Sequence, residues 1–196
     1  MKIVNNKKLI LASASPRRKE LLSRLGIDFV IEASDAPENA ISVEPNDVCR
    51  ELSQIKCNDI ASRHMDEEAI IVSADTIVTF ENTILGKPQD EEDALKMLMS
   101  LSGREHTVYT GVTICSLPNG AKTTFGCATY VKMYDFNKQE AIDYIKTAEP
   151  MDKAGAYGIQ GLGGLLVESI NGDYNNVVGF PLALFVKKMK EMGLMC

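Results

Sequence analysis

Near its amino terminus the chain reads Leu9-Ile-Leu-Ala-Ser13-Ala-Ser15-Pro-Arg17-Arg18-Lys-Glu-Leu-Leu-Ser-Arg-Leu-Gly26. This order predicts a strand, a tight turn and a helix in direct succession. The apolar run from Leu9 to Ala12 is typical of a buried strand. Ser15 is suited to cap the helix, because the proline after it fits a first helical position. Gly26 closes the helix, since glycine readily adopts the left-handed conformation beyond a last turn.

The predicted helix carries two arginines, Arg17 and Arg18, in its first turn. Cations are disfavoured there, because the amino-terminal end of a helix has a positive dipole. A bound anion would reverse this effect, since backbone N–H groups, serine hydroxyls and two guanidinium groups would then face one phosphate chain. The alternative is a capped surface helix with solvated arginines, and this stretch by itself leaves both interpretations open.

The length, net charge and apolar pattern of the sequence limit the classes of protein to consider. The chain has 196 residues and a net charge of −6, which suits one domain or two small lobes. The negative charge argues against nucleic acid as a partner, although it permits a local basic cleft for a small anion. The sequence contains no apolar run long enough to span a bilayer, so we expect no membrane partner.

The cysteines and histidines are also informative. The cysteines are odd in number, scattered and without CxxC spacing, so we expect reduced thiols of a cytoplasmic protein. With only His64 and His106, the sequence argues against histidine-based metal ligation or a Ser–His–Asp triad, and we expect His106 to be structural. The cysteines are Cys49, Cys57, Cys115, Cys127 and Cys196.

The strongest strand prediction covers residues 69–80, where an apolar run is interrupted by Asp75. A carboxylate in a buried strand costs several kcal/mol, roughly, unless it is paired or binds a metal. Asp75 could be a structural residue that caps a turn with help from Thr76. We favour a catalytic role, because a buried acid near two arginines and a cation is a common catalytic arrangement.

Strands and helices alternate along the chain, which predicts an α/β fold. We expect further strands at residues 29–33, 83–85, 104–115, 122–133 and 165–170. We expect further helices from Pro45, from Asp90 to Gly103, from Asn137 to Thr147 and from Leu182 to Met192. No linker or repeat divides the sequence, so we expect one domain over residues 1–196.

Two lysines and a glycine-rich segment remain as candidates. Lys56 lies on the helix that begins at Pro45, where a solvated side chain would be ordinary. Lys87 lies in Gly86-Lys87-Pro88, which lacks the upstream glycines of a Walker A loop. Five glycines lie between Gly155 and Gly164, and they either form plain turns or let backbone N–H groups approach a ligand.

Six motifs in this order resemble the Maf family of nucleoside triphosphate pyrophosphatases. They are Ser13-Ala-Ser-Pro-Arg-Arg18, Ser73-Ala-Asp-Thr76, Gly86-Lys-Pro88, Ser102-Gly-Arg-Glu-His106, Asp152-Lys-Ala-Gly-Ala-Tyr-Gly-Ile-Gln-Gly161 and Asn176-Val-Val-Gly179. The fifth motif resembles the branch that hydrolyses dTTP and UTP. The resemblance implies a twisted mixed sheet flanked by helices, with two lobes around a central cleft as in inosine triphosphate pyrophosphatases. It also implies a cytoplasmic homodimer that releases pyrophosphate and leaves the monophosphate.

The resemblance implies roles for individual residues. Asp75 matches the catalytic proton acceptor, and Asp75 with Glu38 matches the groups that hold a divalent cation, Mg²⁺ or Mn²⁺. Three residues match positions tied to the choice of base, namely Arg17, Thr76 and Gln160. The residues expected near the phosphates are Ser13, Arg17, Arg18, Lys56 and Lys87.

Two other functions stay open at this point. One is a non-catalytic regulator of cell division that binds nucleotides or nucleic acid, since the family was first linked to inhibition of septum formation. The other is a house-cleaning hydrolase for modified nucleotides. A panel of nucleotides with detection of pyrophosphate would separate these functions.

Overall fold

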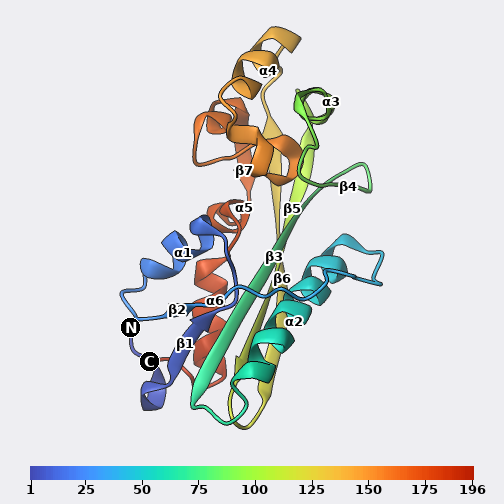
Figure 1. Ribbon diagram of the computed structural model, residues 1–196. Coiled ribbons are helices and arrows are strands. Elements are labelled where there is room, and N and C mark those ends of the chain that lie inside the picture. Colours follow the sequence, from blue (N-terminus) through green and yellow to red (C-terminus); the bar gives the residue numbers. More distant parts are fainter. The chain divides into compact units, whose positions relative to one another are not determined.

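The computed structural model in Figure 1 describes residues 1–196. The chain forms an α/β fold with one mixed sheet of seven strands, in the order β2-β1-β3-β5-β6-β7, and β4 pairs with β3. Strand β1 runs parallel to both β2 and β3, whereas β4 is antiparallel to β3 and β7 is antiparallel to β6. The strands are β1 (Lys8–Leu11), β2 (Val30–Ile31), β3 (Ala69–Phe80), β4 (Thr83–Leu85), β5 (Glu105–Ser116), β6 (Ala121–Met133) and β7 (Val167–Asn171).

Six α-helices accompany the sheet. They are α1 (Pro16–Ser23), α2 (Pro45–Arg63), α3 (Glu91–Leu101), α4 (Lys138–Ile145), α5 (Tyr174–Val178) and α6 (Leu182–Glu191). Short 3₁₀ turns cover Val4–Asn6, Glu149–Asp152, Ala154–Ala156 and Leu162–Leu166. No helix combines the length and apolar character that crossing a membrane requires. The mixed sheet and its helices confirm the expected α/β fold.

The chain divides into two compact units, each assembled from separate segments of the sequence. The first comprises Met1–Asp75, Thr110–Cys127 and Gly179–Cys196, and the second comprises Thr76–Tyr109 and Ala128–Val178. Strands β3, β5 and β6 each contribute residues to both units. The expectation of a single domain over residues 1–196 stays a prediction.

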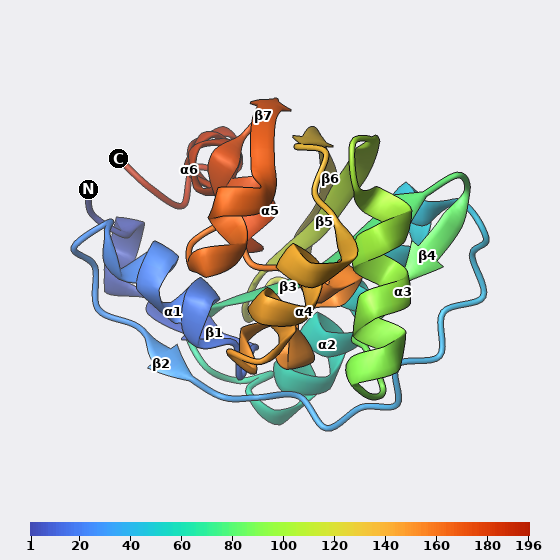
Figure 2. The same cartoon turned by 90° about the horizontal axis from the view of Figure 1, so that it is seen from above.

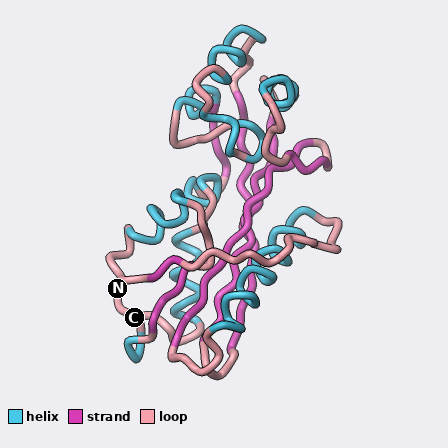
Figure 3. Tube along the Cα trace, in the orientation of Figure 1, coloured by secondary structure: helices cyan, strands magenta, loops and turns pink.

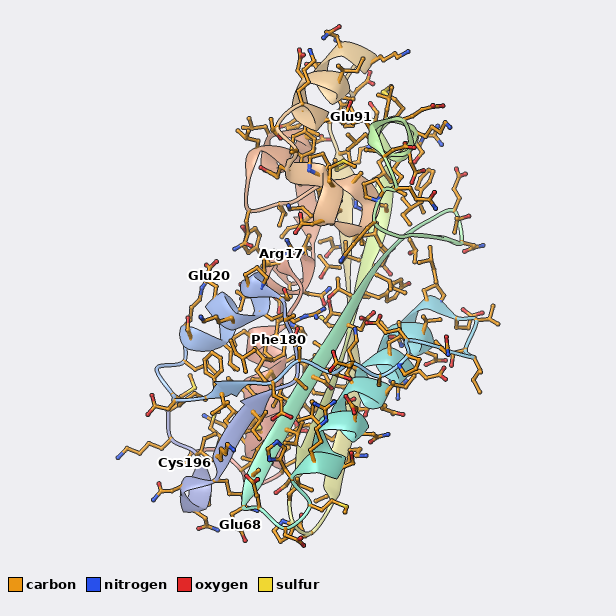
Figure 4. The ribbon with its side chains drawn as sticks, in the orientation of Figure 1. Arg17, Glu20, Glu68, Glu91, Phe180 and Cys196 are labelled. Atoms are coloured by element: carbon orange, nitrogen blue, oxygen red, sulfur yellow. The ribbon has the colours of Figure 1, made fainter.

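In the first unit, α2 covers one face of the strands, and α1 and α6 cover the other (Figures 1 and 2). On the α2 face, Cys57 and Ile60 pack against Ile10 and Ile71 from the strands. On the other face Phe180, labelled in Figure 4, is fully buried, and its ring lies 5.1 Å from that of Phe185. Figure 3 shows the long loop that joins β2 to α2.

In the second unit, α3 packs with α4, as Figure 2 shows. The apolar side of α3 contributes Leu98 and Leu101 to a buried cluster that includes Val131 and Met133 of β6. His106 is buried in this unit, and its Nε2 lies 2.8 Å from the hydroxyl of Tyr157. This position fits the structural role expected for the histidine.

Two expected strands differ from the structure, and the structure contains one helix that was not expected. The strand expected at residues 29–33 is reduced to Val30–Ile31, whose side chains are exposed at the edge of the sheet. The strand expected from residue 165 begins at Val167, because residues 162–166 form a 3₁₀ turn. Helix α5 was not expected, and the Asp173 carboxylate accepts from the backbone N–H of Asn175 at its start.

Candidate active site

The turn between β1 and α1 fixes the guanidinium of Arg18. The Oγ of Ser15 accepts from the backbone N–H of Arg18 at 3.5 Å, so Ser15 caps α1 as predicted. The Oγ of Ser13 accepts from Nη1 of Arg18 at 3.1 Å, and Nε of Arg18 donates to the carbonyl of Gly179 at 3.0 Å. The interpretation of Arg18 as a solvated surface arginine is therefore wrong.

The two arginines lie within one turn of helix and influence each other. Burial lowers the pKa of Arg18, Asp75 acts to raise it, and the positive charge of Arg17 acts to lower it further. Arg17 is half-buried at the amino-terminal end of α1, where Figure 4 labels it. The negative charge of Asp75 in β3 therefore acts on Arg18 in the first turn of α1, and both residues belong to the first unit.

Lys56 brings two carboxylates together. Its side-chain nitrogen lies 2.6 Å from Oδ1 of Asp75 and 3.0 Å from Oε1 of Glu38. The side chains of Lys56 and Asp75 are only 14% and 11% exposed, whereas that of Glu38 is 56% exposed. The interpretation of Lys56 as an ordinary solvated lysine is therefore wrong. Asp75 has in Lys56 the partner that a buried carboxylate requires.

Close packing of α2 on the strands sets the position of Lys56. Gly111 of β5 lies against the backbone of Cys49, and a Cβ at this glycine would overlap the carbonyl of that cysteine. The Oγ of Ser73 in β3 donates to the carbonyl of Ser53 at 2.6 Å, and Oγ of Ser53 lies 2.8 Å from Oγ1 of Thr113. These contacts fix α2 against β3 and β5 at Ser53, one helical turn before Lys56.

Cys49 lies near Asp75, but it has the properties of a buried neutral thiol. Burial and the negative charge of Asp75 raise the pKa of Cys49 to about 12. The thiolate is the nucleophilic form of cysteine, so this residue is unsuited to covalent catalysis at neutral pH. All five cysteines are free, as expected from their spacing.

The carboxylates around Lys56 can be compared with the ligands that a divalent cation takes in proteins. Asp75 and Glu38 both approach the Lys56 ammonium, so two carboxylates already stabilise one positive charge at this place. Nowhere in the structure do three or more His, Cys, Asp or Glu side chains come together in a way that could hold a metal ion. Mg²⁺ characteristically uses one or two carboxylates and completes its shell with water and substrate phosphates. Two carboxylates therefore suit Mg²⁺ where phosphate oxygens complete its shell.

The remaining predicted site residues belong to the second unit. Thr76 follows Asp75 in β3 and is half-buried, and Lys87 is exposed in the segment after β4. The backbone N–H of Gly155 donates to the carbonyl of Gly86 at 3.0 Å, so the Lys87 segment adjoins the glycine-rich segment. Gln160 is exposed within that segment.

Several residues that support the site were not among the candidates from the sequence. Gly179 accepts from Arg18, although its motif was recognised only as part of a resemblance. Ser53 and Ser73 connect α2 to β3 through the hydrogen bond described above. The sequence signal for these two serines was their place at apolar positions of a predicted helix and strand. Buried hydroxyls require hydrogen-bond partners, so serines at such positions indicate a contact between the two elements.

Comparison with solved structures defines the class of fold. The structure of a HAM1 protein from Coxiella burnetii aligns with a TM-score of 0.55 over 94% of this chain and 99% of that chain, at 15% sequence identity. At this identity the likeness concerns the fold, which is a mixed α/β sheet with flanking helices.

Sequence comparison then identifies the family. The family model described as "Maf-like protein" matches residues 8–192, and the chain belongs to the Maf family. A protein of Agathobacter rectalis named dTTP/UTP pyrophosphatase is 44% identical, and the alignment covers 95% of this chain and 98% of that protein. A protein of Thermococcus kodakarensis with the same name is 46% identical, over 94% of this chain and 96% of the relative.

Proposed function

We propose that this protein is a nucleoside triphosphate pyrophosphatase that converts dTTP and UTP, and pyrimidine nucleotides with modified bases, to the monophosphate and pyrophosphate. The names of the Agathobacter and Thermococcus relatives support the substrate class. The observation that carries the proposal is the contact of the Lys56 ammonium with Asp75 and Glu38, in the same unit as Arg18. Cationic groups and a buried acid are what cleavage of a phosphoanhydride requires.

The cationic side chains would neutralise the triphosphate. A nucleoside triphosphate carries about four negative charges near neutral pH, so its cleavage depends mainly on positioning and charge stabilisation. Arg18 suits this role, because its hydrogen bonds to Ser13 and Gly179 hold the guanidinium in a fixed orientation. Arg17, Lys56 and Lys87 would supply further positive charge to the phosphates.

Asp75 would accept the proton of the attacking water. Water adds across the bond between the α- and β-phosphates, which breaks with release of pyrophosphate, and the proton leaves the water as the new P–O bond forms. Lys56 holds Asp75 by one oxygen at 2.6 Å and so orients its carboxylate. A divalent cation held by Asp75 and Glu38, either Mg²⁺ or Mn²⁺, would supply further neutralisation of phosphate charge.

Three residues would set the preference for the base. Gln160 has both a donor and an acceptor on its amide, so it can pair with the edge of a pyrimidine. It is exposed in the glycine-rich segment and therefore available to a ligand. Arg17 and Thr76 complete this set on the basis of the family resemblance.

The proposal extends to the state of the protein in the cell. A cytoplasmic location agrees with five free cysteines, and a homodimer is expected from the family. The net charge of −6 is consistent with a protein that does not bind nucleic acid. Light scattering of the purified protein tests the dimer, and a gel shift at several salt concentrations tests nucleic-acid binding.

The direct test is a panel of canonical and modified nucleoside triphosphates with detection of pyrophosphate. We expect the highest kcat/KM with dTTP and UTP and one pyrophosphate released for each monophosphate. Release of orthophosphate alone would contradict a pyrophosphatase. Nucleotide binding without release of either product would instead support the non-catalytic regulator.

A further inference from the structure

The glycine-rich segment that carries Gln160 encloses the side chain of Glu149. Oε2 of Glu149 accepts from the backbone N–H of Leu162 at 2.9 Å, and Oε1 accepts from that of Gly163 at 3.0 Å. The sequence left open whether backbone N–H groups of this segment face a ligand. Two of them face a carboxylate of the same chain.

Tyr144 of α4 holds the other end of the same segment. Its hydroxyl accepts from the backbone N–H of Gly158 at 3.1 Å and donates to Oε1 of Glu149 at 2.9 Å. Tyr144 is buried, and its hydroxyl and the Glu149 carboxylate form a hydrogen-bonded pair that contacts the segment. Gln160 therefore lies between two anchored positions, at Gly158 on one side and at residues 162–163 on the other.

Two glycines permit this close approach. A Cβ at Gly161 would overlap the carboxylate of Glu149, and a Cβ at Gly163 would overlap the hydroxyl of Tyr144. The backbone after Gln160 thus contacts the pair closely, and the backbone before it contacts the Tyr144 hydroxyl through the N–H of Gly158. The need for glycine here follows from an internal carboxylate and hydroxyl as well as from any bound nucleotide.

The charge state of Glu149 agrees with this arrangement. Burial acts to raise its pKa, but hydrogen bonds from Gly163, Leu162 and Tyr144 outweigh that effect and leave the pKa below its usual value. Glu149 is therefore a carboxylate at neutral pH. A carboxylate accepts stronger hydrogen bonds from N–H groups than a neutral acceptor does.

We infer that Glu149 and Tyr144 are positioning residues, which fix the segment of residues 158–163 and so place the amide of Gln160 for recognition of the base. This inference rests on the proposed function, since it gives Gln160 its role. Without either side chain the segment loses an anchor, and Gln160 samples more orientations. Selectivity among bases should then fall more than the turnover of bound substrate does.

The test compares kcat/KM for UTP and CTP in Glu149→Gln, Tyr144→Phe and Gln160→Ala variants. We expect Gln160→Ala to reduce the UTP/CTP ratio, and each positioning variant to reduce it by about tenfold, through KM for UTP more than through kcat. In the Gln160→Ala background the positioning variants should change the ratio no further, because coupled residues act through one contact.

Glu140→Gln is the matched control. The Glu140 carboxylate also accepts from a backbone N–H in the second unit, that of Asn137 at 2.7 Å, but it caps α4 and does not contact the Gln160 segment. This variant should lose stability and keep the UTP/CTP ratio. Hydrogen exchange of Leu162 and Gly163 should accelerate in Glu149→Gln and stay unchanged in Glu140→Gln.

The outcomes separate the inference from the function on which it rests. If the wild-type protein releases no pyrophosphate from any nucleotide, the proposed function is wrong, while hydrogen exchange still tests the anchoring of the segment. If Gln160→Ala changes the ratio and neither positioning variant does, the inference is overturned and the function stands. Unchanged exchange at Leu162 and Gly163 in Glu149→Gln would also overturn it.

Discussion

The side-chain nitrogen of Lys56 lies 2.6 Å from Oδ1 of Asp75, and both side chains are almost fully buried. Helix α2 supplies the lysine and β3 supplies the acid. An ion pair in such a place is costly to break, because the partner left behind keeps its charge without compensation. The pair therefore links the stability of the first unit to the chemistry proposed for it.

Replacing Lys56 by methionine removes the charge and keeps a side chain of similar length. We expect Lys56→Met to lower the free energy of unfolding by about 3 kcal/mol and to reduce kcat/KM by about 100-fold, because Asp75 loses its partner and the phosphates lose a cation. Urea denaturation and the pyrophosphate assay measure the two effects. Lys96→Met is the control, since Lys96 pairs with Glu92 at the surface, where such pairs contribute little. Equal unfolding midpoints for the two variants would contradict a stabilising role of the Lys56–Asp75 pair.

Replacing Arg18 by lysine keeps the charge and loses the planar fork. A lysine cannot contact Ser13 and the Gly179 carbonyl with two fixed donors as Arg18 does. We expect Arg18→Lys to raise KM for UTP by about tenfold, because the cation is present but no longer held in position. Arg24→Lys changes the residue that caps the carboxyl end of α1 and pairs with Glu20 at the surface, and it should keep the wild-type KM. Similar KM values for both variants would remove the orienting role of Arg18.

Glu38 should affect the requirement for metal more than the maximal rate. Removal of divalent cations with EDTA should abolish release of pyrophosphate, and addition of Mg²⁺ should restore it. In Glu38→Gln we expect the Mg²⁺ concentration for half-maximal activity to rise about tenfold, because one anionic oxygen donor is lost. Glu44→Gln, in the same loop and without a side-chain cap bond to α2, is the control. An unchanged Mg²⁺ dependence in Glu38→Gln would exclude this acid from the metal site.

The two histidines should make stability depend on pH in opposite directions. Burial lowers the pKa of His106 to about 4, so the unfolded chain binds a proton below about 6.5 while the folded protein does not. The stability associated with neutral His106 is fully present above pH 6.5 and is lost as the pH falls toward 4, by up to about 3 kcal/mol. His106→Gln should flatten this part of the curve of unfolding free energy against pH.

His64 should act in the opposite direction. Hydrogen bonds to Glu32 and Glu67 raise its pKa above 6.5. Its contribution is therefore present below pH 6.5 and is lost as the pH rises through the pKa of the folded state. In His64→Gln the stability lost relative to the wild type should be larger at pH 6 than at pH 9. The same sign of pH dependence for both histidine variants would contradict these assignments.

The sequence predicted the elements whose signals are local. The apolar run of residues 69–80 gave the bounds of β3, and the Ser15-Pro16 pair gave the cap of α1. Helix α5 was missed because it has only five residues, and its start depends on the Asp173 cap rather than on apolar periodicity. Elements that rely on one hydrogen bond leave a weak pattern in sequence.

Contacts between distant segments could not be derived from the residues themselves. The bond from Arg18 to Gly179 joins positions 161 residues apart, and it depends on how α1 and the segment before α6 pack. Lys56 looked like an ordinary helical lysine, and only the placement of α2 on β3 and β5 brings it to Asp75. The resemblance to a family named these residues, whereas the structure gives the physical reason for grouping Lys56, Glu38, Asp75 and Arg18.

The most direct test of the account is the rate of pyrophosphate release from UTP by the Asp75→Asn variant, measured beside its affinity for UTP. Asparagine keeps the shape of the side chain and cannot accept the proton of the attacking water. We predict a loss of kcat of at least about 1,000-fold with nucleotide binding still measurable, because the cationic groups that hold the phosphates stay in place. Release of pyrophosphate at the wild-type rate would remove Asp75 from the reaction and contradict the account.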